Sequence, residues 1–88
     1  MSNINVVGMF CHIPKGDGGW YQGSILDVLP DGSFVVQLYE WFMGEPSKVE
    51  VFASSRLDGS CLYDTEEEWR SMGDALMKQT SYEFRRMQ

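Results

Sequence analysis

The distribution of glycine and proline along the 88-residue chain changes near residue 60, and this change limits the folds that the chain can adopt. Eight of its nine glycines and all three of its prolines lie at or before Gly59. They divide the first part of the chain into short runs, which is typical of strands joined by turns. From Asp64 onward only Gly73 interrupts the sequence, so a helix can form there. We therefore expect a sheet followed by one helix, within a single domain.

Four runs in the first part are rich in β-branched and aromatic residues. These runs are residues 4–13, 20–29, 33–42 and 48–53. Asp31-Gly32, between the second and third runs, is a strong hairpin signal. Alternation in the third run places Phe34, Val36 and Leu38 on one face, which should be buried. We expect the rest of the core to be made by Val6, Val49 and Val51.

The expected helix begins at residues 64–68, where a capping side chain precedes three carboxylates. Either Asp64 with Glu67 or Thr65 with Glu68 fits a capping box, which satisfies free backbone N–H groups of the first helical turn. The three negative charges also suit the positive end of the helix dipole. Both pairings predict the same start of the helix.

The apolar side chains after this cap follow one face of the expected helix. Trp69, Met72 and Leu76 are spaced as i, i+3 and i+7, so they form a stripe that should lie on the sheet. Gly73 lowers the intrinsic stability of a helix. Residues 80–88 are therefore either a further helical stretch or a frayed tail.

Charge and hydropathy exclude several classes of partner. Thirteen acidic residues against seven basic ones give a net charge of −6, and the basic residues form no stripe, so generic nucleic-acid binding is disfavoured. No apolar run approaches the roughly 18 residues of a membrane span. The N-terminus carries no basic leader, so we expect a cytoplasmic protein that does not enter a membrane. Cys11 and Cys61 are then expected to be reduced.

The side chains that could support catalysis or bind a metal are sparse. His12 is the only histidine, and strand alternation turns it away from Cys11, so we interpret His12 as a strand-end side chain near a loop. The paired Cys and His spacings of a zinc site are absent. The loop at residues 16–19 lacks the Lys-Ser/Thr of a phosphate-binding loop. We expect no enzyme activity, no metal and no cofactor.

The order of five segments between residues 6 and 57 forms a family pattern. These segments are Val7–Cys11, Gly19–Ile25, Phe34–Tyr39, Val49–Phe52 and Ser54–Leu57. Together they resemble the Tudor branch of the SH3-like barrels. The resemblance implies a mainly β fold, in which residues 1–63 form a bent antiparallel barrel of about five strands. The helix of residues 64–88 would pack on this barrel. Pro14 stands where the family often has an aromatic residue.

The same resemblance implies a binding site on one rim of the barrel, for a methylated Lys or Arg side chain or for a peptide. It places Tyr21 after the first loop, and Tyr39 with Trp41 or Phe42 at the end of the third strand.

Independently of the family, this region holds more large side chains than a small barrel can bury. They are Trp20, Tyr21, Tyr39, Trp41, Phe42 and Met43. Some of them should therefore be exposed, and the alternative is that Trp41, Phe42 and Met43 fold under the helix as a second small core. Glu40 and Glu45 would draw a basic partner to the rim.

These observations predict a non-enzymatic interaction module that binds a protein or a basic peptide. The predicted site consists of Tyr21, Tyr39, Glu40, Trp41, Phe42 and Glu45. The alternative is a small acidic inhibitor, a decoy that imitates nucleic acid and blocks a basic protein surface. Salt separates the two, because the affinity of a decoy falls steeply with ionic strength.

Overall fold

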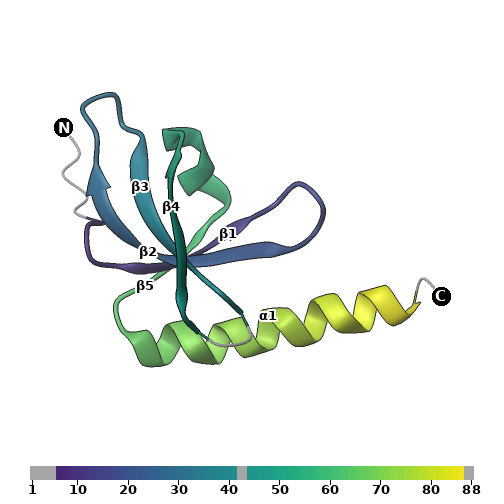
Figure 1. Ribbon diagram of the computed structural model, residues 1–88. Coiled ribbons are helices and arrows are strands. Elements are labelled where there is room, and N and C mark those ends of the chain that lie inside the picture. The colour runs from purple at the N-terminus through teal and green to yellow at the C-terminus, as the bar shows by residue number, and fades with distance from the viewer. Residues whose placement is uncertain (1–5, 42–43, 87–88) are drawn as a thin grey trace.

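The computed structural model describes residues 6–41 and 44–86, with side chains described as far as Met77 (Figure 1). The elements, in order, are β1 (Phe10–Pro14), β2 (Trp20–Val28), β3 (Phe34–Tyr39), β4 (Pro46–Phe52), the 3-10 helix η1 (Ser54–Gly59), β5 (Cys61–Tyr63) and α1 (Glu66–Arg86). The strands pair antiparallel in one sheet of order β4-β3-β2-β1-β5. The expectation of about five antiparallel strands and one C-terminal helix is confirmed.

The hairpin between β2 and β3 forms at the predicted Asp-Gly turn. The Gly32 N–H donates to the Leu29 carbonyl at 2.9 Å, and the Ser33 N–H donates to the Asp31 carboxylate at 2.9 Å. Gly32 has a φ of +91°, which a residue with a side chain rarely adopts. The register shifts between Ile25 and Asp27, and such a bulge bends a strand.

One face of this bent sheet encloses an apolar cluster, which we call the inner core. It consists of Val6, Cys11, Ile13, Ile25, Phe34, Val36, Leu38 and Phe52. The predicted inward face of β3 is confirmed. The prediction for β4 is wrong, because Val49 and Val51 are 54% and 55% exposed. Phe52 points inward instead, opposite Phe34. A change of one residue in strand phase exchanges the two faces.

Helix α1 begins at the predicted cap. The Glu68 N–H donates to the Thr65 hydroxyl at 3.2 Å, and this hydroxyl donates to the Glu68 carboxylate at 3.3 Å. Of the two pairings that fit a capping box, the structure uses Thr65 with Glu68. The helix then continues through Gly73 to Arg86, so residues 80–86 are helical. Residues 87–88 lie outside the described residues.

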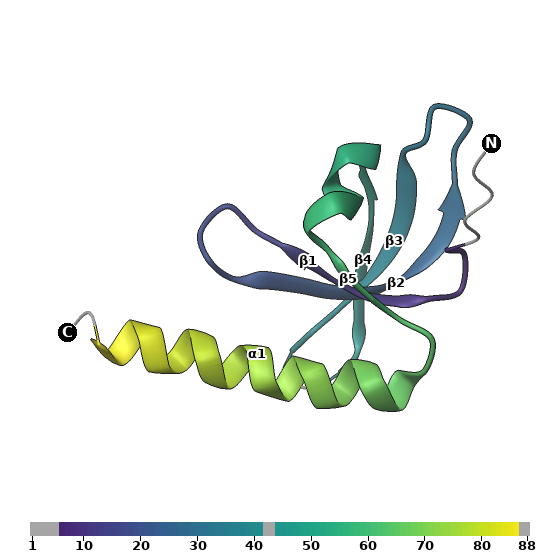
Figure 2. The same ribbon diagram turned by 180° about the vertical axis from the view of Figure 1, so that it is seen from behind.

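The other face of β1 and β5 is covered by α1, which runs along the sheet and continues beyond it (Figures 1 and 2). The side chains between them form a second cluster, which we call the helix-side layer: Phe10, His12, Gln22, Trp41, Tyr63 and Trp69. Trp69 is buried as predicted, and Leu76 is half-buried. Met72 is 44% exposed, so the predicted stripe is wrong at this position. Gly73 takes its place against the sheet.

No helix among the described residues is both long and apolar enough to cross a membrane.

Candidate functional site

His12 is the polar side chain that is buried most completely in the helix-side layer. It is 0% exposed, so its interpretation as a strand-end side chain near a loop is wrong. Its ring stacks nearly parallel on Trp41, with centroids 5.5 Å apart, and its Nδ1 shares a hydrogen bond of 2.9 Å with the Tyr63 hydroxyl. Within the described part of the chain, Nε2 has no hydrogen-bond partner. Burial lowers the pKa of His12 to about 4, an effect that the Gln22 side chain partly offsets.

The two cysteines lie on different sides of the sheet from one another. Cys11 is in the inner core, where burial raises the pKa of its thiol to about 12. His12 follows it on the opposite face, as strand alternation predicts, so the two do not form a catalytic pair. Cys61 lies opposite His12 in the β1–β5 ladder, and both cysteines are free thiols. Burial first, and then the Cys61 side chain, raise the pKa of Tyr63.

Gly73 is a point of close approach between α1 and this layer. A Cβ at Gly73 would lie 3.2 Å from His12 Nε2 and 3.2 Å from the Trp41 ring. These contacts are tighter than nine in ten real Cβ contacts, and the His12 side chain that they meet is fully buried. The glycine that weakens the helix locally is therefore what lets the helix approach His12 and Trp41.

A shallow hollow of about 180 Å³ lies where β2 begins and β3 ends, and we call it the aromatic hollow. It is lined by Lys15, Trp20, Tyr21, Gln22, Leu38, Tyr39, Glu40, Trp41, Ser47 and Lys48. All four of its aromatic side chains are half-buried. Each of these residues is therefore partly accessible to solvent.

Hydrogen bonds and ring contacts fix the walls of the aromatic hollow. The Trp41 indole N–H donates to the Trp20 carbonyl at 2.9 Å, and the Gln22 side-chain amide donates to the Glu40 carbonyl at 3.1 Å. Tyr39 packs edge-on against Trp69, with centroids 5.4 Å apart. The hollow is thus a preorganised surface, which reduces the entropy lost on binding.

Two lysines add positive charge to the rim of the aromatic hollow. The Lys15 ammonium lies 4.9 Å from the centre of the Tyr21 ring, a cation–π contact within the chain. Lys48 pairs with Glu50 at 3.0 Å, and hydrogen bonding to Glu50 raises its pKa. Glu40 supplies a negative charge at the same rim. The rim therefore carries charges of both signs.

The structure brings together four of the six residues predicted as the site: Tyr21, Tyr39, Glu40 and Trp41. Glu45 does not line the aromatic hollow. It is exposed in the turn before β4, where its carbonyl accepts the Glu40 N–H at 2.8 Å. Phe42 and Met43 lie outside the described residues.

Sequence reasoning missed Lys15 and Lys48 as members of the site. The only available signal was the pairing of β1 with β2 and of β3 with β4, which brings the ends of these strands together. Trp20 was recognised as a large side chain in this region but was not assigned to the site.

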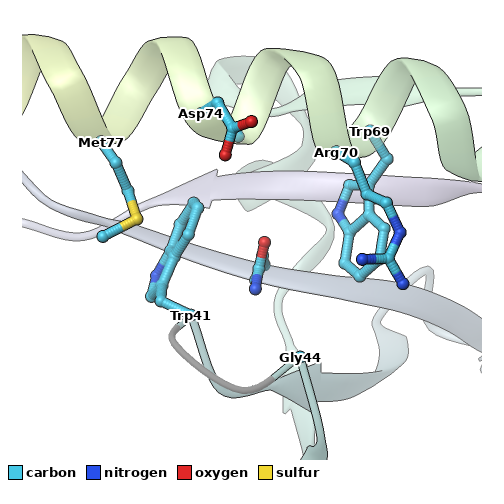
Figure 3. A pocket seen from close by; sticks show the side chains of 8 residues that line it. Trp41, Gly44, Trp69, Arg70, Asp74 and Met77 are labelled. Carbon is cyan, nitrogen blue, oxygen red and sulfur yellow. The ribbon is translucent and has the colours of Figure 1, made fainter.

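A second, larger cavity of about 310 Å³ lies between α1 and the end of β3 (Figure 3). Its lining is Gln22, Trp41, Gly44, Trp69, Arg70, Gly73, Asp74 and Met77. In Figure 3, Asp74 and Met77 reach from α1 toward Trp41, while Trp69 and Arg70 stand at the other end. Trp41 lines both cavities. One part of this residue therefore lies at the rim of the aromatic hollow, and another part packs under α1.

Comparison of the chain with protein-family models, with characterised proteins and with solved structures gives no match.

Proposed function

We propose that this chain is a non-enzymatic interaction module that binds a peptide of a partner protein in the aromatic hollow. One observation carries the proposal: four of the six residues predicted from the sequence as a binding surface line a single preorganised hollow. Its volume of about 180 Å³ is below the roughly 300–1,000 Å³ of typical small-molecule sites, and it suits one side chain of a peptide. Aromatic side chains are also enriched in protein interfaces.

We further propose that the sheet is a bent barrel of the SH3-like type. The all-antiparallel order β4-β3-β2-β1-β5 and the bulge at Ile25 and Asp27 support this assignment. The short helix η1 between β4 and β5 adds to the support, because the Tudor pattern ends in a short helical turn with a leucine, and η1 contains Leu57, which packs against the inner core. Such barrels serve many functions, so the peptide-binding role depends on the aromatic hollow and not on the fold.

The charges suit a partner that is basic overall and inserts an uncharged side chain. The net charge of −6 attracts a basic protein over long range. At the aromatic hollow itself, Lys48 is neutralised by Glu50, and Lys15 already covers Tyr21. A cationic side chain of the ligand would have to displace Lys15 from that ring. We therefore propose an aromatic or aliphatic anchor, with basic residues beside it near Glu40.

The test is selection of peptides from a displayed library on the intact protein, followed by calorimetric titration of the best binder. Trp20→Ala should weaken binding by about 30-fold, since central aromatic residues often contribute about 2 kcal/mol to an interface. Trp20 is well suited to this test because the hydrogen bond to Trp41 uses its backbone carbonyl, which the substitution keeps.

The matched control is Leu26→Ala, which removes an apolar side chain of the same strand that is 48% exposed and lies outside the aromatic hollow. Its peptide affinity should equal that of the parent. Selection of no peptide at all, or equal affinity of the Trp20→Ala protein, would overturn the proposal. An affinity that collapses with added salt but ignores Trp20→Ala would favour the acidic decoy instead.

A further inference from the structure

Strand β4 forms one edge of the sheet and is the starting point for an inference that does not depend on the aromatic hollow as a binding site. Pro46 and the residues from Val49 to Phe52 pair with β3, with a register shift between them, and no strand of the described chain pairs with the other side of β4. β4 passes in front of β1 and β2 in Figure 1 and behind them in Figure 2. An open edge of this kind presents backbone N–H and C=O groups that can pair with another strand.

Pro46 and the register shift interrupt the start of β4, as such features do on protected edges, whereas Val49 to Phe52 form a regular ladder with β3. Val49 and Val51, more than half exposed, lie on the outer face of the sheet, where Val51 is opposite Val35. Lys48 and Glu50 alternate with them on the other face and form an ion pair of 3.0 Å. The strand thus offers an apolar face and a face with one charge of each sign.

The order Lys48-Val49-Glu50 is self-complementary under a two-fold axis. If two copies of β4 pair antiparallel with Val49 facing Val49, then Lys48 lies opposite Glu50 of the second copy, and Glu50 lies opposite its Lys48. Directly opposite side chains in such a ladder are about 5 Å apart at Cβ, so both ion pairs can form. Registers centred on Lys48 or on Glu50 would instead place like charges face to face, which is destabilising.

We propose that two copies of this chain associate through β4, antiparallel and centred on Val49, to form a continuous sheet across a symmetric dimer. The pairing satisfies the open backbone edge and brings the two outer-face Val49 side chains into contact. It also creates two intermolecular ion pairs. Each chain carries a net charge of −6, so the dimer is stabler at about 150 mM salt, where screening beyond roughly 8 Å weakens the repulsion between remote charges. Ion pairs at the strand spacing persist under these conditions.

The test uses Lys48→Glu and Glu50→Lys separately and then mixed. By sedimentation or light scattering at sub-millimolar concentration, the parent should have twice the mass of one chain. Each variant alone should be monomeric, because either substitution makes both cross-strand pairs like-charged, two carboxylates in the first variant and two ammonium groups in the second. The equimolar mixture should form a heterodimer, since both cross-strand pairs are again of opposite sign.

The mixture also tests whether the Lys48–Glu50 pair acts only by stabilising its own chain. Each variant still lacks this internal pair after mixing, so restored association must come from pairs between the two chains. Circular dichroism of each variant should match the parent. A parent that stays monomeric, a single variant that stays dimeric, or a mixture that does not associate would each overturn the proposal. Since mass is measured without any peptide, the outcome is independent of binding at the aromatic hollow.

Discussion

The inner core and the helix-side layer bury opposite faces of the same strand, β1, with different chemistry. The inner core is apolar and includes Cys11 and Ile13 from β1. The helix-side layer takes Phe10 and His12 from the same strand and adds tryptophan, tyrosine and a glutamine. Alternate residues of β1 therefore contribute to both regions. The inner core is buried by the sheet itself, whereas the helix-side layer is buried only when α1 packs on the sheet.

This difference teaches that the two regions should fail under different conditions. The inner core contains no group that titrates near neutral pH, since the pKa of Cys11 is raised to about 12. The helix-side layer contains a buried histidine with an unpartnered nitrogen, within the part of the chain that the structure describes. The stability of the helix-side layer therefore depends on the protonation of His12 and on how closely α1 packs on the sheet.

Trp69→Ala should lower the free energy of unfolding by about 3–5 kcal/mol, because it leaves a cavity in the helix-side layer. The indole ring stacks on Phe10 at 4.9 Å, and its N–H donates to the Cys11 carbonyl at 3.1 Å. Urea unfolding measures the change. Trp69→Phe keeps a ring and should recover most of the loss. A Trp69→Ala protein as stable as the parent would show that α1 is not anchored through this residue.

Acid should destabilise the protein through His12. The pKa of His12 falls from 6.5 to about 4 on folding, because burial disfavours the charged form. The unfolded chain therefore binds the proton first as pH drops below 6.5, and stability falls by roughly 3 kcal/mol by pH 4. Chemical unfolding between pH 7 and pH 5 measures the first part of this loss. In His12→Gln the slope over this range should flatten, and an unchanged slope would assign it to other groups.

Gly73→Ala should destabilise the protein by about 1–2 kcal/mol, although alanine favours a helix over glycine by about 1 kcal/mol. The added methyl group would meet His12 and Trp41 at 3.2 Å. Ser71→Ala, at an exposed position in the same helix, is the control and should be neutral or slightly stabilising. Thermal melts distinguish the two. A more stable Gly73→Ala protein would mean that the helix can move away from the sheet at little cost.

Thr65→Ala should cost about 1 kcal/mol, the usual contribution of a helix N-cap. It removes the hydroxyl that accepts the Glu68 N–H at 3.2 Å. Thr65→Ser keeps this hydroxyl and should retain the stability of the parent. If the inner core is independent of the helix, Thr65→Ala will increase hydrogen exchange in α1 more than in β3. Equal increases in both elements would show that the two regions open together.

The sequence predicted the inner core where alternation was clean and failed at the edge of the sheet. In β3 every second residue is large and apolar, and the predicted face is the buried one. In β4 the alternating valines predicted a buried face in the same way. The inner face is instead the one that carries Phe52, and Lys48 and Glu50 lie on it. At an edge the inner face opens to solvent, so long charged side chains on it can still reach water.

The helix-side layer could be predicted only in part. The cap and Trp69 are local signals, and both were readable from the sequence. The burial of His12 depends on how far α1 approaches the outer face of β1, a tertiary contact with no local signature. The same limit applies to the aromatic hollow, whose aromatic residues lie at predicted strand ends, whereas Lys15 and Lys48 join it only through strand register.

The free cysteines give the inner core a kinetic reporter and a reference thiol in the same chain. Cys11 lies in the inner core with its thiol pKa raised to about 12, and Cys61 lies half-buried opposite His12. Since only the thiolate attacks a thiol reagent, Cys11 reacts when the inner core opens, whereas the partly exposed Cys61 reacts without that opening. The ratio of the two labelling rates in native buffer therefore measures how often the inner core opens.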